Sequence, residues 1–164
     1  MPAPERTVLF LCTGNSARSI MAEALLNHLG RGRFLAFSAG SHPKGSVHPQ
    51  ALAQLRREGL PVKGLRSKSW EEFAAAGAPR LDIVITVCDR AAAEECPYWP
   101  GAPVTAHWGI DDPAAVEGAP EAQARAFKRA YRELERRVRR LVDLPIDALD
   151  QAGLRHRLRE LERE

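Results

Sequence analysis

The chain has 164 residues, of which 45% are hydrophobic and 27% are charged, as in a single globular domain with a substantial core. A formal net charge of +3 is too small to indicate a nucleic-acid-binding protein, and no apolar run reaches the length of a membrane span. The N-terminus shows no signal-peptide pattern, so we expect a cytoplasmic protein. We also expect a monomer that binds neither nucleic acid nor membranes. Because cytoplasmic thiols stay reduced, the odd number of cysteines indicates reactive thiols rather than a structural disulfide.

The N-terminal half alternates between predicted strands and helices. A continuous apolar run predicts a buried strand over residues 7–11. Apolar residues at helical spacing then predict a helix over residues 17–30, which ends at a glycine. A second strand is expected over residues 33–38 and a second helix over residues 49–58, with a loop rich in proline and glycine between them. A serine followed by two glutamates predicts a short helix over residues 69–75.

The C-terminal half continues the alternation. Residues 81–87 show the strongest strand pattern of the chain, and a helical turn is expected over residues 89–96. A fourth, short strand is predicted over residues 104–107. A long amphipathic helix follows over residues 120–142, and Pro145 ends it.

This alternation predicts the fold class: an α/β protein of three layers, with a four-stranded parallel sheet and helices on both faces. We expect one domain over residues 1–144, with residues 145–164 as a C-terminal helical extension of the same domain. Ligands of such sheets bind outside the carboxyl ends of the strands. Cys12, Cys88 and the loop over residues 108–113 all follow strands at that edge, so we expect them to share one site.

The loop after the first predicted strand has the composition of an anion site. Its backbone N–H groups and the following helix N-terminus can bind an oxyanion, and Arg18 adds a bidentate fork. Cys12 then faces the anion as a thiolate nucleophile. We expect Ser16 and Ser19 to donate hydrogen bonds to its sulfur, and Asn15 to adopt a left-handed conformation that braces the loop. The predicted oxyanion-binding residues are Thr13, Gly14, Asn15, Ser16, Ala17, Arg18 and Ser19.

Asp112 is the candidate general acid. Displacing an oxygen from an oxyanion requires a proton donor for the leaving group, and Asp112 lies before a proline in the loop after the fourth strand. The Asp-Pro pair is equally common at turns and helix starts, so a structural interpretation stays open. For His107 two interpretations also stay open, a contact with the anion and a structural role. Tyr98, Trp99 and Trp108 are expected to pack in the core.

Cys88 and Cys96 are candidates for a thiol relay. A second thiol can attack an intermediate on Cys12, and a third can take over the resulting disulfide. The alternative is that Cys88 is a small buried strand residue and that Cys96 is incidental. In a continuous helix, Cα atoms eight residues apart lie about 12 Å from each other, beyond the roughly 4.4–6.8 Å of a disulfide. A Cys88–Cys96 bond therefore requires this segment to loop or unwind.

Several motifs together resemble the low-molecular-weight protein tyrosine phosphatase superfamily. The start of the chain carries two of them, Val8 to Ala24 and Phe37 to Gly40. Four further motifs are similar to the thioredoxin-coupled arsenate reductase branch of that superfamily: Val84 to Asp89, Cys96-Pro97, Thr105 to Gly109 and Asp112-Pro113.

The resemblance implies a mechanism for arsenic detoxification. Cys12 attacks arsenate held by the loop and Arg18, while Asp112 protonates the departing hydroxyl. Cys88 then attacks the adduct, releases arsenite and leaves a Cys12–Cys88 disulfide, which Cys96 converts to a Cys88–Cys96 disulfide. An external reductant, thioredoxin or a glutaredoxin or low-molecular-weight thiol system, closes the cycle without a bound cofactor. Phosphate and sulfate are the expected competing anions, and weak phosphatase activity is expected to remain.

The chain departs from the superfamily pattern in two places. Alanines follow Asp112-Pro113 where tyrosine phosphatases usually carry tyrosines, which disfavours the alternative function, a tyrosine phosphatase with a cysteinyl-phosphate intermediate. Some reductases of the superfamily bind potassium through an Asn, a Glu, a Ser and an Asp. Asn15, Glu23 and Ser38 match three of these, but residues 65–70 supply no acid, so we expect no metal site. A non-catalytic oxyanion-binding regulator would leave the three thiols unexplained.

Overall fold

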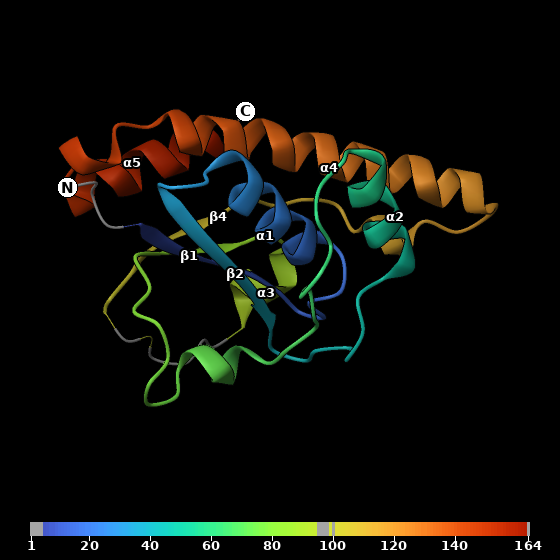
Figure 1. Ribbon diagram of the computed structural model, residues 1–164, viewed down its shortest axis with the longest axis horizontal. Coiled ribbons are helices and arrows are strands. Elements are labelled where there is room, and N and C mark those ends of the chain that lie inside the picture. Colours follow the sequence, from blue (N-terminus) through green and yellow to red (C-terminus); the bar gives the residue numbers. More distant parts are fainter. Residues whose placement is uncertain (1–4, 95–98, 100, 164) are drawn as a thin grey trace.

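The computed structural model describes residues 5–94, 99 and 101–163. Its centre is one parallel sheet in the order β2-β1-β3-β4, which confirms the predicted α/β class (Figure 1). The strands are β1 (Arg6–Cys12), β2 (Phe34–Gly40), β3 (Ile83–Thr86) and β4 (Val104–His107). Leu11 pairs with Ala39 of β2 on one side and with Thr86 of β3 on the other, so the carboxyl ends of these strands are level.

Alternate residues of β1 divide the core between the two sheet faces. Val8 and Phe10 belong to the larger cluster, which receives apolar side chains from the five α-helices. Leu9 and Leu11 face the smaller cluster, which is closed by a 3-10 helix and loop residues. Figure 1 shows α4 and α5 along one side of the sheet and the green 3-10 helix on the other. Trp99 and Trp108 are buried as expected, whereas Tyr98 lies outside the described residues.

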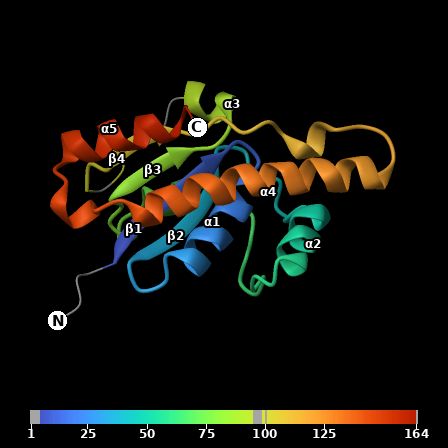
Figure 2. The ribbon, with the colours of Figure 1, turned by 90° about the horizontal axis from the view of Figure 1, so that it is seen from above.

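The helices follow the predicted order. The α-helices are α1 (Arg18–Leu29), α2 (Pro49–Arg57), α3 (Asp89–Ala93), α4 (Pro120–Asp143) and α5 (Gln151–Leu161). The 3-10 helices are η1 (Trp70–Phe73), η2 (Pro113–Ala115) and η3 (Ile146–Ala148). Figure 2 shows α4 running along the sheet. No helix in the described ranges is both long and apolar enough to cross a bilayer.

Two predicted helices differ from the structure. The helix expected over residues 89–96 ends at Ala93, because Glu94 has extended backbone angles. The C-terminal extension is not one helix: after η3 the chain is extended at Leu149, and α5 begins where the Asp150 carboxylate accepts a hydrogen bond from the Gly153 N–H. Buried leucines of α5 join the larger core cluster, so the extension packs on the body of the protein.

Candidate active site

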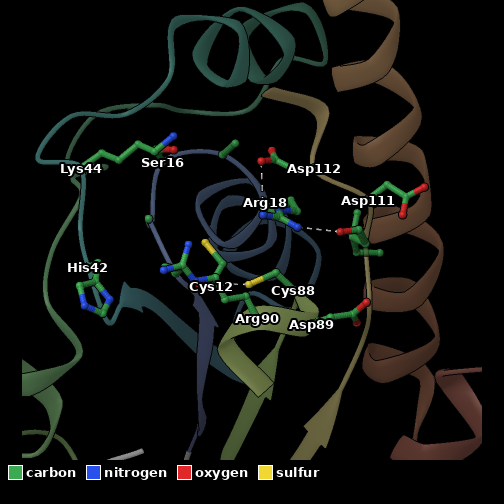
Figure 3. A pocket seen from close by; sticks show the side chains of 14 residues that line it. Cys12, Ser16, Arg18, His42, Lys44, Cys88, Asp89, Arg90, Asp111 and Asp112 are labelled. Carbon is green, nitrogen blue, oxygen red and sulfur yellow. Dashed lines mark hydrogen bonds and ion pairs between the residues drawn. The ribbon is translucent and has the colours of Figure 1, made fainter. Parts of the chain in front are cut away.

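A pocket of about 590 Å³ opens at the carboxyl edge of the sheet. In Figure 3 the side chains of Cys12, Arg18, Cys88 and Asp112 are gathered around it, although they come from different segments of the chain. Of the predicted anion-binding residues, five line this pocket besides Cys12: Thr13, Gly14, Ser16, Ala17 and Arg18. Asn15 and Ser19 are fully buried and support the loop from behind. Cys96 lies outside the described residues.

Cys12 ends β1 and is 3% exposed. Its Sγ lies 2.9 Å from Ser19 Oγ, which is the contact expected from the sequence. Asn15 Nδ2 donates to the same Ser19 oxygen at 2.8 Å, so the Ser19 hydroxyl hydrogen is free to point at the sulfur. The Ser19 hydroxyl can therefore donate a hydrogen bond to the Cys12 sulfur. The expectation for Ser16 is wrong: among the described residues no hydrogen bond joins its hydroxyl to Cys12 Sγ. Its carbonyl accepts instead from the His48 N–H at 2.8 Å.

Asn15 braces the loop as predicted. Its φ of 45° is left-handed, a conformation that Asn tolerates better than most residues. Its side chain donates to Ser38 of β2 at 3.0 Å and accepts from the backbone N–H of Lys68 at 2.9 Å. One amide therefore connects the loop to β2 and to the segment that precedes η1.

Gly40, at the end of β2, allows the loop to pack against the sheet. A Cβ added there would lie 2.4 Å from the Thr13 carbonyl oxygen and 2.8 Å from that of Cys12. Both atoms belong to backbone, which cannot rotate away as a side chain can.

We therefore expect Gly40→Ala to displace the anion loop. The variant should bind inorganic phosphate at least about tenfold more weakly, a loss of about 1.4 kcal/mol. Isothermal titration of phosphate into folded variant and wild type measures this difference. Unchanged affinity would show that the close approach of β2 does not set the loop geometry.

Arg18 is oriented by the loop after β4. Its Nη1 donates to the Ile110 carbonyl at 2.8 Å, and its Nη2 lies 3.7 Å from Asp112 Oδ2. The other carboxylate oxygen of Asp112 accepts from the Ala114 N–H at 3.0 Å and caps η2. Asp112 thus starts a helical turn and also lines the pocket, so its two interpretations are compatible.

Cys88 lies at the junction of β3 and α3 and is 2% exposed. Its sulfur accepts a hydrogen bond from the Ala91 N–H at 3.3 Å and so caps α3. It also lies 3.8 Å from Oγ1 of Thr13, and Thr13 directly follows Cys12 in the anion loop. The Thr13 hydroxyl donates to Glu94 at 3.1 Å, which ties the end of α3 to the anion loop.

His107 has a structural place. Its Nε2 lies 2.7 Å from Asp89 Oδ1 and its Nδ1 lies 2.8 Å from Thr86 Oγ1, so the ring connects β3 and β4 to the start of α3. It is not among the residues that line the pocket. Of its two interpretations from the sequence, the structural one agrees with these contacts.

Three cationic side chains line the pocket. Lys44 and Arg90 line it together with Arg18, and the Lys44 side chain lies beside Gly14, where an added Cβ would come within 3.2 Å of it. Sequence reasoning missed Lys44 and Arg90, because neither belongs to a motif or a periodic segment. These three cations share the pocket with three aspartates, Asp89, Asp111 and Asp112, and they offset the negative charge that would otherwise repel a small anion.

His48 supports the loop from the side of α2. Its Nδ1 accepts from the Gln50 N–H and caps α2, and its ring centroid lies 4.8 Å from that of Phe127. Burial, followed by the charge of Lys44, lowers the pKa of His48 below its ordinary value of 6.5, while Asp112 opposes the shift. The neutral ring is the form that can accept the capping hydrogen bond.

We expect His48 to make the protein less stable in mild acid. Because folding lowers the pKa of His48, the unfolded chain takes up the proton more readily, and stability falls as the pH drops from 7.5 to 5.5. His48→Asn keeps a capping oxygen but does not titrate, so it should lose less stability over that interval. Urea unfolding at both pH values gives the comparison. An equal pH dependence in the two proteins would contradict the assignment.

The three residues that match a potassium site do converge. Ser38 Oγ donates to Glu23 Oε1 at 2.6 Å and accepts from Asn15. The Lys68 ammonium, however, lies 3.6 Å from the same Glu23 oxygen. It supplies the positive charge that a potassium ion would bring, so the residues present do not fit a resident potassium ion. In the described part of the chain, no cluster of three or more Asp, Glu, His and Cys residues offers a metal site.

Residues 7–155 match the low molecular weight phosphotyrosine protein phosphatase family. Because the match covers most of the chain, and the sheet order and the Cys12 loop occupy the expected places, the protein belongs to this family.

Within the family, the chain is similar to arsenate reductases. That of Bacillus licheniformis is 36% identical over 140 residues, which cover 85% of this chain and 96% of the relative. The solved arsenate reductase from Archaeoglobus fulgidus is 30% identical, with a TM-score of 0.65 over 84% of this chain and 99% of the other. A thioredoxin-dependent arsenate reductase of Corynebacterium glutamicum is 26% identical, with a TM-score of 0.61 over 86% of this chain and 62% of the other.

Proposed function

We propose that this protein reduces arsenate to arsenite by a thiol relay through Cys12, Cys88 and Cys96. The observation that carries the proposal is the place of Cys88. Its sulfur lines the same pocket as Cys12 and lies 3.8 Å from the Thr13 hydroxyl of the anion loop. A phosphatase needs one thiol in this pocket, whereas reduction needs a second one within reach of the first.

The first step is attack by Cys12 on arsenate. Backbone N–H groups of the loop and the Arg18 guanidinium hold the anion, with Arg18 aimed by the Ile110 carbonyl. A sulfur–arsenic bond forms and one arsenic–oxygen bond breaks. Asp112, beside Arg18, gives its proton to the departing oxygen, which leaves as water.

The second step transfers two electrons to arsenic. The Cys88 thiolate attacks the Cys12 sulfur, a disulfide forms between them, and the electron pair of the sulfur–arsenic bond stays on arsenic, which leaves as arsenite. Cys88 must give up its capping hydrogen bond to α3 for this attack. α3 has only five residues, so losing this cap frees a helix with little stability of its own.

The third step regenerates the nucleophile. Cys96 attacks the Cys88 sulfur, frees the Cys12 thiolate and leaves a Cys88–Cys96 disulfide. A dithiol reductant then reduces this disulfide. Thioredoxin is the first candidate, because a similar protein from Corynebacterium glutamicum is thioredoxin-dependent. The relay requires reduced thiols at the start of each cycle, and this requirement fits a cytoplasmic enzyme of arsenic detoxification.

Phosphate and sulfate have the same shape and charge as arsenate and should compete for the loop. The alternative function, a tyrosine phosphatase, uses the same first step on a phosphate ester. Pro113 and two alanines form η2 next to Asp112, and no Phe, Tyr or Trp is among the described residues that line the pocket. This arrangement favours a small oxyanion over a large aromatic ester.

The test is arsenate turnover with thioredoxin, thioredoxin reductase and NADPH, compared between wild type, Cys88→Ser and Cys96→Ser. The proposal expects NADPH oxidation with wild type alone. A parallel assay with glutaredoxin and a low-molecular-weight thiol identifies the reductant. If both variants turned over arsenate like wild type, the relay would be wrong. If wild type itself reduced no arsenate but hydrolysed a phosphate ester, the phosphatase would be the better assignment.

A further inference from the structure

Lys68 and Glu23 form an ion pair beneath the anion loop. Their side chains are 6% and 13% exposed, and Lys68 Nζ lies 3.6 Å from Glu23 Oε1. The ammonium also donates to the Arg66 carbonyl at 2.9 Å. Burial raises the pKa of Glu23 and lowers that of Lys68, while each charge opposes the shift of the other. Two buried charges of this kind depend on one another, because removing either leaves the other uncompensated.

A chain of hydrogen bonds leads from this pair to the nucleophile. Ser38 donates to Glu23 at 2.6 Å, and Asn15 donates to Ser38 at 3.0 Å. The same Asn15 amide donates to Ser19 at 2.8 Å, and Ser19 lies 2.9 Å from Cys12 Sγ. The hydrogen bond from Ser38 to Glu23 needs an acceptor oxygen on the Glu23 carboxyl group, and an ionised carboxylate is the strongest acceptor.

The backbone of Lys68 strengthens the same connection. Its N–H donates to Asn15 Oδ1 at 2.9 Å, and its carbonyl accepts from the Gly40 N–H at 2.9 Å. The Asn15 amide is therefore held on both sides: its nitrogen donates to Ser38 of β2, and its oxygen accepts from Lys68, whose carbonyl is bonded to the end of the same strand. The orientation of Asn15 in turn leaves the Ser19 hydroxyl directed at Cys12.

We propose that Lys68 is the built-in cation of this site, in place of the potassium ion that some arsenate reductases of the family bind, and that it positions Asn15 and Ser19 around Cys12. Lys68 and Glu23 are thus positioning residues that touch no substrate. The loop of this protein should need no metal ion. This inference rests on the anion-binding loop rather than on the later redox steps of the proposed function.

The site offers a direct way to test the role of the charge. A hollow of about 230 Å³ lies on the other side of Glu23 and is lined by Glu23 and Asn27 among others. In Lys68→Ala, a small cation can enter there and pair with Glu23. Potassium is close to an ammonium group in size and takes oxygen ligands, whereas choline is too large to fit.

The experiment compares wild type and Lys68→Ala in potassium chloride and in choline chloride at equal ionic strength. Two quantities are measured: the melting temperature and the affinity for inorganic phosphate by calorimetry. Wild type should give the same values in both salts. In choline, Lys68→Ala should melt at least about 2 °C lower, the smallest shift expected for a loss of about 1 kcal/mol in a chain of this length. It should also bind phosphate at least tenfold more weakly, and potassium should restore most of both losses.

Two controls complete the design. Lys128→Ala removes an exposed lysine of α4 and should behave like wild type in both salts. Glu23→Gln combined with Lys68→Ala removes the partner of the cation and should abolish the potassium rescue. The proposal is overturned if wild type itself needs potassium, or if Lys68→Ala shows the same values in potassium and choline. Neither readout uses arsenate reduction, so a failure here is distinct from a failure of the proposed function.

Discussion

Cys88→Ser is expected to lower steady-state arsenate reduction at least about 1,000-fold while leaving hydrolysis of a small phosphate ester within about threefold of wild type. The substitution removes the thiol that forms the second sulfur bond but keeps a side-chain oxygen that can accept from the Ala91 N–H and cap α3. The loop, Arg18 and Asp112 stay in place for the attack by Cys12. Arsenite release and p-nitrophenol release, measured on the same preparation, separate the two activities.

The melting temperature of Cys88→Ser is the control, and it should stay close to that of wild type because the cap is preserved. Equal loss of both activities would mean that Cys88 supports the loop rather than the electron transfer. Unchanged arsenate reduction would remove Cys88 from the relay altogether.

Arg18→Lys is expected to lower kcat/KM about 100- to 1,000-fold for arsenate and for a phosphate ester alike, the range found when one preorganised donor of an oxyanion site is removed. The guanidinium donates to the Ile110 carbonyl and still offers a second nitrogen to the anion, whereas an ammonium cannot make this planar, two-point arrangement. Steady-state kinetics with both substrates measures the loss.

Arg129→Lys, an exposed arginine of α4, is the matched control and should match wild type. A drop for only one of the two substrates would contradict the view that Arg18 holds the shared oxyanion. Activity near wild type would show that the backbone N–H groups of the loop bind the anion without it.

The features of the site that could be predicted from sequence are those that depend on residues close together in the chain. The loop from Cys12 to Ser19 lies between an apolar run and a helical pattern, and the left-handed Asn15 and the Ser19 contact are local consequences of that loop. β1 and β3 could be placed because buried parallel strands are continuous apolar runs. Their order brings Cys12 and Cys88 to one edge, as the topology of such sheets predicts.

The rest depends on contacts between distant segments. Lys68 lies in an aperiodic stretch, and only the fold shows that its ammonium meets Glu23 of α1. α3 is shorter than predicted because Glu94 leaves the helix and accepts from the Thr13 hydroxyl. α5 begins at the Asp150 cap, after the extended Leu149. Asp150 is a recognisable N-cap residue in the sequence, but the amphipathic pattern on both sides of it predicts a continuous helix.

The central claim, that the Cys12 and Cys88 sulfurs exchange electrons with arsenic, is tested most directly by a single turnover of Cys96→Ser. This variant is mixed with excess arsenate and no external reductant, then quenched in acid, and arsenite and disulfide-linked peptides are quantified. The account predicts about one arsenite per chain together with a Cys12–Cys88 disulfide. Arsenite without that disulfide, or the disulfide without arsenite, would contradict it.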